Sequence, residues 1–248
     1  MKKLVLVLLL LVVMTTPVMA KTVFDFPSIG YSQEDFKKLS TDLGLAISYM
    51  PLAPAEPLGG VLPGFDIGVE ATYVKIDNNQ NYWKRIAQVG GDEIPSALVF
   101  PKLHIQVGLP VVPIDLGYVY SSVPGTDIKL MGGEIKWAIM KGGVVMPALA
   151  IRGAYTKLSG IDVLDISTKS VDLSISKGFL MFTPYAGYGM VRIESKENDP
   201  DVPLKEESIT EGKAFVGFKL SLLPVLNIVA EGDFAKVNAY SLRLNLHF

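Results

Sequence analysis

The residues that could do chemistry in this chain are charged side chains and a histidine, placed at every second position of otherwise apolar segments. Asp66 and Glu70 share one such segment, and Lys102 and His104 share another. Successive side chains of a strand point to opposite faces, so this spacing gathers the charges on one face. The predicted inward-facing set is Asp66, Glu70, Lys102, His104, Glu134, Lys136, Arg152, Asp172, Arg192, Lys219, Glu231, Asp233 and Arg243.

His104 is the one histidine well inside these segments, because His247 lies at the chain end. A histidine next to a carboxylate or hydroxyl can act as a general base. Ser96 is well separated from it in sequence, and a hydrogen-bonded wall residue is the simpler interpretation. We therefore predict no enzyme activity. With two histidines and no cysteine, the sequence also predicts no metal site and no cofactor.

Strands of about ten residues must position the charges, because alternation of apolar and polar residues is the main signal after residue 43. The last segment is the clearest example. Its apolar face consists of Tyr240, Leu242, Leu244, Leu246 and Phe248. Its polar face consists of Ser241, Arg243, Asn245 and His247. One face suits lipid and the other suits a polar interior.

The composition favours a membrane. Hydrophobic residues make up 49% of the chain and the mean hydropathy is +0.35. No apolar run after residue 20 approaches the roughly 18 residues of a membrane helix, so a closed β-barrel is the remaining way to span a bilayer. A soluble β-sandwich also alternates, but globular strands usually have about 5–6 residues. The weak net charge of −2 argues against nucleic acid as a partner.

Residues 1–20 have the pattern of a secretory signal peptide. Lys2 and Lys3 precede an apolar run from Leu4 to Met14, and small residues lead to a cleavage site after Ala20. The run is shorter than the roughly 20 residues that span a membrane as a helix. We expect an exported protein of a Gram-negative cell, located in the outer membrane.

The connections alternate between short and long, as periplasmic turns and extracellular loops do in outer-membrane barrels. The longer ones are 77–96, 158–166 and 195–211. Eleven strands can be counted with a first strand at Leu43–Met50. Because single-chain barrels have even strand numbers, the prediction is an all-β, transmembrane, antiparallel up-and-down barrel of about twelve strands over 43–248, with ten as the alternative.

A short amphipathic helix is predicted over Ser32–Asp42, within an N-terminal segment 21–42. Ser32 occupies an N-cap position and a carboxylate follows three residues later, which resembles a capping box. Phe36, Leu39 and Leu43 then follow at helical spacing. This helix could plug the barrel or lie at its periplasmic rim.

The C-terminal strand gives the chain its resemblance to a known class. Alternating apolar residues ending in Phe248 resemble the final strand of bacterial outer-membrane β-barrel proteins, and 54–70 resembles uncharacterised small barrels of this type. The resemblance implies that Tyr240, Leu242, Leu244, Leu246 and Phe248 are read by the barrel assembly machinery. It also implies periplasmic chaperones, outer-membrane lipid and lipopolysaccharide as partners. It implies no functional residue and no oligomeric state.

Three functions remain open. The first is a porin-like barrel for passive passage of small solutes, or for binding and transport of a small hydrophobic ligand. The second is a closed structural or surface-interaction barrel, in which charges of mixed sign pair across the interior. The third is an outer-membrane hydrolase. Barrels of about eight strands are filled by side chains and barrels of 16–18 are open, so a strand number of ten to twelve does not decide between an open and a filled interior.

The motif Tyr82-Trp83-Lys84-Arg85 could bind lipopolysaccharide phosphates, cover the mouth, or be an interface aromatic pair with solvated charges.

Overall fold

The computed structural model describes residues 30–90 and 94–248. The predicted signal peptide and residues 21–29 lie outside them. The elements are α3 (Gln33–Ile47), β1 (Gly64–Lys75), α4 (Asn81–Gly90), β2 (Ala97–Gly108), β3 (Ile114–Ser122), β4 (Lys129–Lys141), β5 (Ala148–Ser159), β6 (Leu164–Ser176), β7 (Phe182–Glu197), β8 (Glu207–Leu223), β9 (Leu226–Phe234) and β10 (Ala239–His247).

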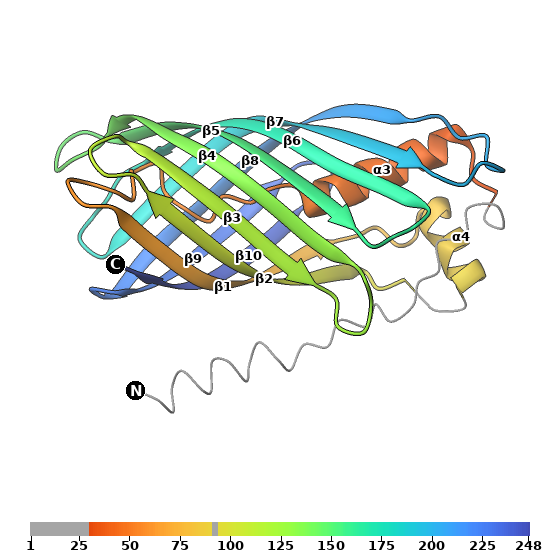
Figure 1. Cartoon of the computed structure of the whole chain (residues 1–248), viewed down its shortest axis with the longest axis horizontal. Coiled ribbons are helices and arrows are strands. Elements are labelled where there is room, and N and C mark those ends of the chain that lie inside the picture. The colour runs from red at the N-terminus through yellow and green to blue at the C-terminus, as the bar shows by residue number, and fades with distance from the viewer. Residues whose placement is uncertain (1–29, 91–93) are drawn as a thin grey trace.

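The strands form a closed antiparallel barrel in which each strand pairs with its neighbours in sequence (Figure 1). β1 pairs with β10 from Asp66–His247 to Val74–Ala239 and closes the barrel. The predicted up-and-down barrel is confirmed. Its strand number is ten, so the alternative count was right and the favoured count of twelve was wrong.

The predicted first strand at Leu43–Met50 is wrong, because α3 continues to Ile47. Leu43, Leu45 and Ile47 alternate as strand residues would. Yet Gly44 and Ala46 between them are buried as well. The helix is surrounded by the barrel wall, and a helix that is buried all round loses its one-sided apolar pattern. The barrel therefore begins at Gly64 rather than at residue 43.

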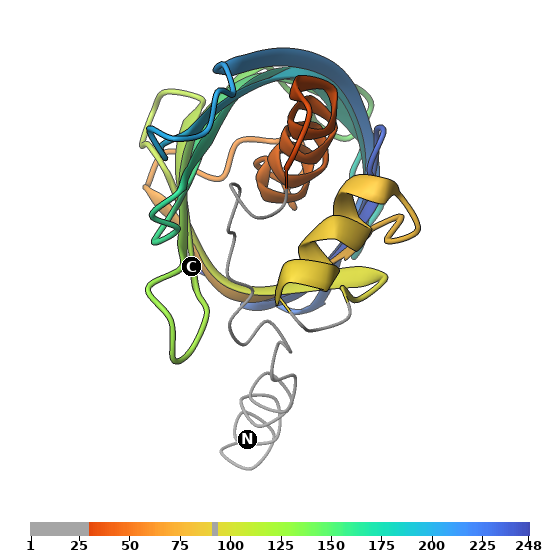
Figure 2. The same ribbon diagram turned by 90° about the vertical axis from the view of Figure 1, so that its right-hand side faces the viewer.

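The start of α3 follows the predicted cap. Ser32 Oγ accepts a hydrogen bond from the Asp35 backbone N–H at 3.1 Å and donates to the Asp35 carboxylate at 2.9 Å. Two acidic residues in the first turn interact favourably with the positive end of the helix dipole. Figure 2 looks along the barrel and shows α3 inside the ring of strands.

The two ends of the barrel differ in their connections. The end with the short links 109–113, 142–147, 177–181 and 224–225 is called the turn end here, and it also holds the chain's last residue (Figure 1). The other, called the loop end, holds the links 76–96, 123–128, 160–163, 198–206 and 235–238. The predicted loops 158–166 and 195–211 are shorter in the structure, because strands β5 to β8 extend further than expected. The link 76–96 contains α4, which was not predicted.

The outer wall is apolar from the turn end to beyond mid-height, and on β1 as far as Tyr73. Large exposed hydrophobic residues there include Phe65, Ile67, Leu103, Ile135, Trp137, Leu173, Tyr188, Val216, Leu242 and Leu246. This surface is that of a barrel facing lipid rather than water. Among the described residues, no helix is long and apolar enough to cross a membrane.

Candidate functional site

The barrel interior is occupied by the chain's own N-terminal segment. α3 enters at the loop end, and residues 48–63 continue to the turn end, where β1 begins (Figures 1 and 2). α3 together with 48–63 is called the plug here. The interior of this barrel is therefore the candidate site, and the contacts between the wall and the plug determine its chemistry.

The loop-end half of the interior is an apolar core. Phe36 and Leu39 of α3 are completely buried, as are Val74 and Ile193 of the wall. The cluster also contains Leu98, Leu130, Leu158, Leu164, Ile166, Val191 and Ile209 of the wall and Trp83 and Ile86 of α4. Each fully buried side chain of this size contributes about 1.5–3 kcal/mol. Packing of this kind holds α3 to the wall.

Gly44 marks the closest approach of helix and wall. A Cβ built at Gly44 would lie 2.3 Å from Ile193 Cγ2, well inside van der Waals contact. One turn earlier, Ser40 Oγ donates to Ser195 Oγ at 2.9 Å, and both residues are buried. The helix therefore lies directly against β7, which agrees with its position in Figure 2.

The turn-end half of the interior is charged, and most of its charged side chains lie in ion pairs. Lys102 Nζ lies 2.6 Å from Glu70, Lys136 Nζ 2.8 Å from Asp115, and Arg152 Nε 2.9 Å from Glu134. Lys213 pairs with Asp233 at 3.1 Å, and Arg243 pairs with Asp66. All these side chains are buried. Opposite charges across neighbouring strands thus neutralise one another in the wall.

The same wall residues also bind the plug backbone. Lys213 Nζ donates to Tyr49 O at 2.6 Å, and Glu231 accepts from Leu52 N–H at 3.0 Å. Further along, Lys136 Nζ donates to Pro54 O at 3.0 Å and to Glu56 O at 2.9 Å. Asp115 accepts from Leu58 N–H, and Ser176 Oγ accepts from Ala55 N–H. Six backbone groups of a segment that has no strand partner thus receive hydrogen bonds from or give them to side chains of the wall.

Both ring nitrogens of His104 have partners inside the charged half of the interior. Its Nδ1 lies 3.1 Å from Glu70 Oε2 and its Nε2 lies 3.0 Å from the Tyr49 hydroxyl. Glu70 also accepts from Lys102. His104 and Glu70 are both buried completely or nearly so. A histidine with both nitrogens engaged and no solvent contact ties the plug to the wall through Tyr49.

The structure locates every residue of the predicted inward set. Eleven of its members lie on the interior face and are buried or nearly so, namely Asp66, Glu70, Lys102, His104, Glu134, Lys136, Arg152, Asp172, Glu231, Asp233 and Arg243. Lys219 is partly buried and faces a cavity at the turn end. Arg192 lies on the outer face, and its side chain is 59% exposed. The inward placement of Arg192 was therefore wrong.

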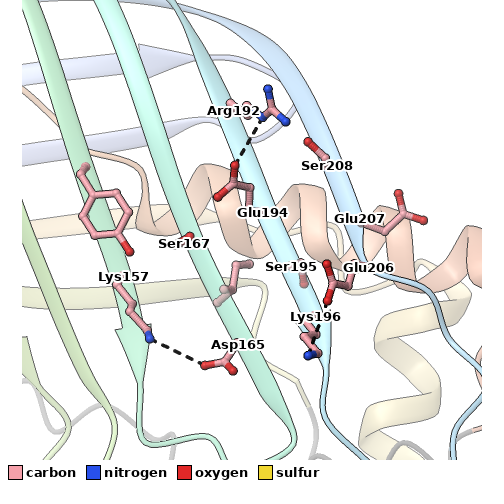
Figure 3. A pocket seen from close by; sticks show the side chains of 12 residues that line it. Lys157, Asp165, Ser167, Arg192, Glu194, Ser195, Lys196, Glu206, Glu207 and Ser208 are labelled. Atoms are coloured by element: carbon pink, nitrogen blue, oxygen red, sulfur yellow. Dashed lines mark ion pairs between the residues drawn. The ribbon is translucent and has the colours of Figure 1, made fainter.

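Arg192 was misplaced because the wall changes character along β7. At this height the inward residues Val191 and Ile193 are the apolar ones, since they face α3. Arg192 instead lies in an outer groove of about 450 Å³ formed by β5 to β8. Figure 3 shows its pair with Glu194 at 3.4 Å.

The groove carries charges of both signs. In Figure 3, Lys157 points to Asp165 at 3.9 Å and Lys196 to Glu206 at 3.5 Å. These side chains are about half exposed or more, and exposed pairs contribute about 0–1 kcal/mol. The groove is a solvated surface at the loop end.

α4 lies across one side of the rim of the barrel mouth at the loop end (Figure 2). Tyr82 Oη and Trp83 Nε1 donate to the Asp42 carboxylate at 2.8 and 3.0 Å. Burial raises the pKa of Asp42, and these two donors oppose that rise. Burial and the neighbouring Asp42 likewise raise the pKa of Tyr82. The aromatic residues of this motif therefore hold α4 against α3, and its binding to lipopolysaccharide phosphates stays a prediction.

A small polar cavity of about 110 Å³ remains at the turn end. Lys219, Arg243 and His247 line it from the wall. Its inner side is formed by plug residues 52–54 and 56–58. The cavity is a recess that ends at the plug.

The residues of the predicted assembly signal lie on β10 and, for Phe248, directly after it, and they point outward. Tyr240, Leu242, Leu246 and Phe248 are 42–63% exposed, and Leu244 is partly exposed. Within the described residues there is no group of three or more His, Asp or Glu residues that could hold a metal ion.

Comparison with known proteins gives matches of fold alone. No family model matches the chain, and no curated protein matches its sequence. The N-terminal β-barrel domain of OprF from Pseudomonas aeruginosa is 13% identical, over 74% of this chain and 97% of that chain, with a TM-score of 0.37. The outer membrane protease OmpT from Escherichia coli is 10% identical, over 75% and 96%, with a TM-score of 0.37. Neisserial surface protein A is 8% identical, over 75% and 95%, with a TM-score of 0.29.

These similar structures are bacterial outer-membrane barrels, and similarity at this level transfers no function. The architecture of the present chain rests on its own closed strand pairing and on its apolar outer wall.

Proposed function

We propose that this protein is an outer-membrane barrel with a closed interior, which acts structurally or through its surface at the loop end rather than as a passive pore. The observation that carries the proposal is the plug. Its helix packs in the apolar half of the interior, and its extended part is hydrogen-bonded to wall charges as far as Leu58.

The proposal places the loop end at the cell surface, because the two longest links, 76–96 and 198–206, lie there and longer loops are extracellular in outer-membrane barrels. Export by the signal peptide, with cleavage after Ala20, belongs to the same proposal. So do the Gram-negative origin and the partners expected from the last strand: the assembly machinery, periplasmic chaperones, lipid and lipopolysaccharide.

The proposal is non-enzymatic. A general base must reach a proton on its substrate. Both nitrogens of His104 are engaged by Glu70 and Tyr49, and its side chain has no exposed surface. This supports a structural role for His104.

A locked plug tests the proposal. Ser40 and Ser195 have hydroxyl oxygens 2.9 Å apart, and the chain has no cysteine of its own. The double variant Ser40→Cys/Ser195→Cys should form a disulfide, whose sulfurs lie about 2.05 Å apart. Conductance of the refolded mature protein is then measured in planar bilayers, oxidised and reduced. Ser40→Cys alone is the matched control.

We expect no steady conductance from the wild type, the control or either redox state of the double variant. Steady conductance of the fully oxidised variant would overturn the closed interior, since the plug cannot leave. Conductance of the wild type and the reduced variant, silenced by oxidation, would also overturn it and would identify a pore gated by plug movement.

A further inference from the structure

The turn end of the barrel exposes apolar side chains where water-facing turns usually carry polar ones. Val144 and Leu180, at the tips of two turns, are fully exposed or nearly so. The exposed apolar residues at this end are Val61, Leu62, Val111, Val112, Val144, Val145, Met146, Phe179, Leu180, Met181, Leu222, Leu223, Val225 and Phe248. They come from all four turns, from the end of β8, from the segment before β1 and from the chain's last residue, and together they are called the apolar ring here.

The backbone of these turns is paired internally. Lys177 Nζ donates to Gly143 O and Val144 O, both at 2.7 Å, and to Met146 O at 3.3 Å. Phe179 and Phe182 exchange both backbone hydrogen bonds, at 2.7 and 2.9 Å.

The backbone of the turn between β2 and β3 is also paired internally. Val111 N–H donates to Gly60 O at 2.7 Å, and Val112 N–H donates to Pro110 O at 2.8 Å. Pro110 and Pro113 have no N–H to satisfy. Internal pairing of backbone groups is what a low-dielectric environment requires.

Two turn residues adopt a backbone conformation that their side chains disfavour. Val111 has a φ of 70° and Leu180 a φ of 54°. Glycine or asparagine occupies this region more easily, and a β-branched residue there is an outlier. An apolar side chain thus occupies both sites at a cost in backbone strain, which indicates that its contact with the surroundings matters.

The ring is continuous with the lipid-facing wall. Outward apolar residues of β1 run from Phe65 to Tyr73, which at 3.4 Å per residue is about 27 Å along the strand. With a strand tilt of about 40°, their height is roughly 21 Å, whereas the apolar band of such barrels is about 25 Å tall. The ring supplies the missing height at the turn end.

We propose that the apolar ring is inserted into the lipid of the periplasmic leaflet, at the boundary between hydrocarbon and headgroups. The occupant of this surface is therefore lipid, and the barrel ends within the membrane on this side instead of projecting into the periplasm. The inference rests on the proposed location in a bilayer with the loop end at the cell surface, but it does not depend on whether the interior is closed.

Spin labels on single cysteines test the placement. Leu180→Cys and Val144→Cys carry labels on two turns, Leu173→Cys on the apolar outer wall is the lipid reference, and Asp127→Cys in a loop-end link is the water reference. The accessibility of each label to oxygen and to a water-soluble nickel chelate is measured in vesicles that contain this protein alone. We expect nickel accessibility at 180 and 144 to be at least several-fold lower than at 127, with a depth between those of 127 and 173.

Nickel accessibility at 180 and 144 equal to that at 127 would overturn the proposal. If those sites were then protected in native outer membranes, the ring would bind a protein partner instead of lipid.

Leu180→Asn provides a second test whose sign differs between the two environments. Asparagine tolerates the left-handed conformation and relieves the strain. In water this change should raise the denaturant midpoint of the vesicle-embedded protein. In lipid we expect a lower midpoint and slower insertion into vesicles, and a higher midpoint would contradict the insertion of the ring.

Discussion

The two halves of the barrel are inside-out relative to each other. In the turn-end half, charged residues such as Glu70 and Arg152 face the interior, and the outer wall is apolar. In the loop-end half, Ile193 faces the interior, and the neighbouring Arg192 faces outward. One continuous strand thus has a polar inner face at one height and an apolar inner face at another. The polarity of the inner face matches the part of the plug that it contacts, and the polarity of the outer face matches the surrounding lipid or water.

The largest loss of stability should come from removing a buried charge from the turn-end half of the interior. Glu70→Ala removes the carboxylate that pairs with both Lys102 and His104 and leaves a buried cation without its partner. Breaking such a pair costs about 3–5 kcal/mol. We expect a loss of this size in the free energy of unfolding, measured by guanidinium titration in lipid vesicles.

Glu194→Ala is the matched control, because Glu194 pairs with Lys169 and Arg192 on the exposed outer face of the other half. Exposed pairs contribute about 0–1 kcal/mol. Equal losses for the two variants would show that the charged interior is solvated.

The next effect should come from the apolar half. Ile193→Ala opens a cavity beside Gly44 of the plug, and large-to-small changes at such sites cost about 2–5 kcal/mol. The adjacent Arg192→Ala should cost less than about 1 kcal/mol. The same titration measures both. A reversed order would mean that β7 presents its other face to the plug.

The smallest effect concerns the contact between plug and α4, and it depends on pH. The raised pKa of Asp42 means that the folded state holds this proton more tightly than the unfolded chain, whose value is near 3.8. Its contribution to stability is therefore complete below pH 3.8 and is lost as the pH rises through the folded-state pKa.

Asp42→Asn keeps an acceptor for Tyr82 and Trp83 but has no charge. We expect the variant to be at least as stable as wild type near pH 7 and to lack the loss of stability above pH 3.8. Unfolding titrations across this range measure the difference. An unchanged pH profile would assign the dependence to other groups.

Much of the wall was predictable from alternation, and the plug was not. The last strand and the cap at Ser32 follow local rules that the structure confirms. α3 was cut short at Asp42 because its second half is buried on every side and carries no one-sided pattern. α4 was missed since its aromatic residues Tyr82 and Trp83 turn toward the plug, and nothing local in sequence specifies that.

The sequence of β7 contains a signal that the inner face is apolar in the loop-end half. Tyr188 and Met190 place their apolar side chains at even positions, whereas Val191 and Ile193 place theirs at odd positions. The pairing of β7 with β6 continues through this point without a bulge. A switch of apolar parity inside one regular strand therefore indicates that the interior changes from polar to apolar, and it identifies Arg192 as outward.

The route of the chain also bears on how the protein is built. α3 starts at one mouth of the barrel, and β1 starts at the other, so the polypeptide is threaded through a ring made from its own later residues. Contacts such as Ser40 with Ser195 join residues 155 positions apart. Because β1 follows the plug in the chain and pairs with β10, the pairing of these two strands closes the ring around the plug.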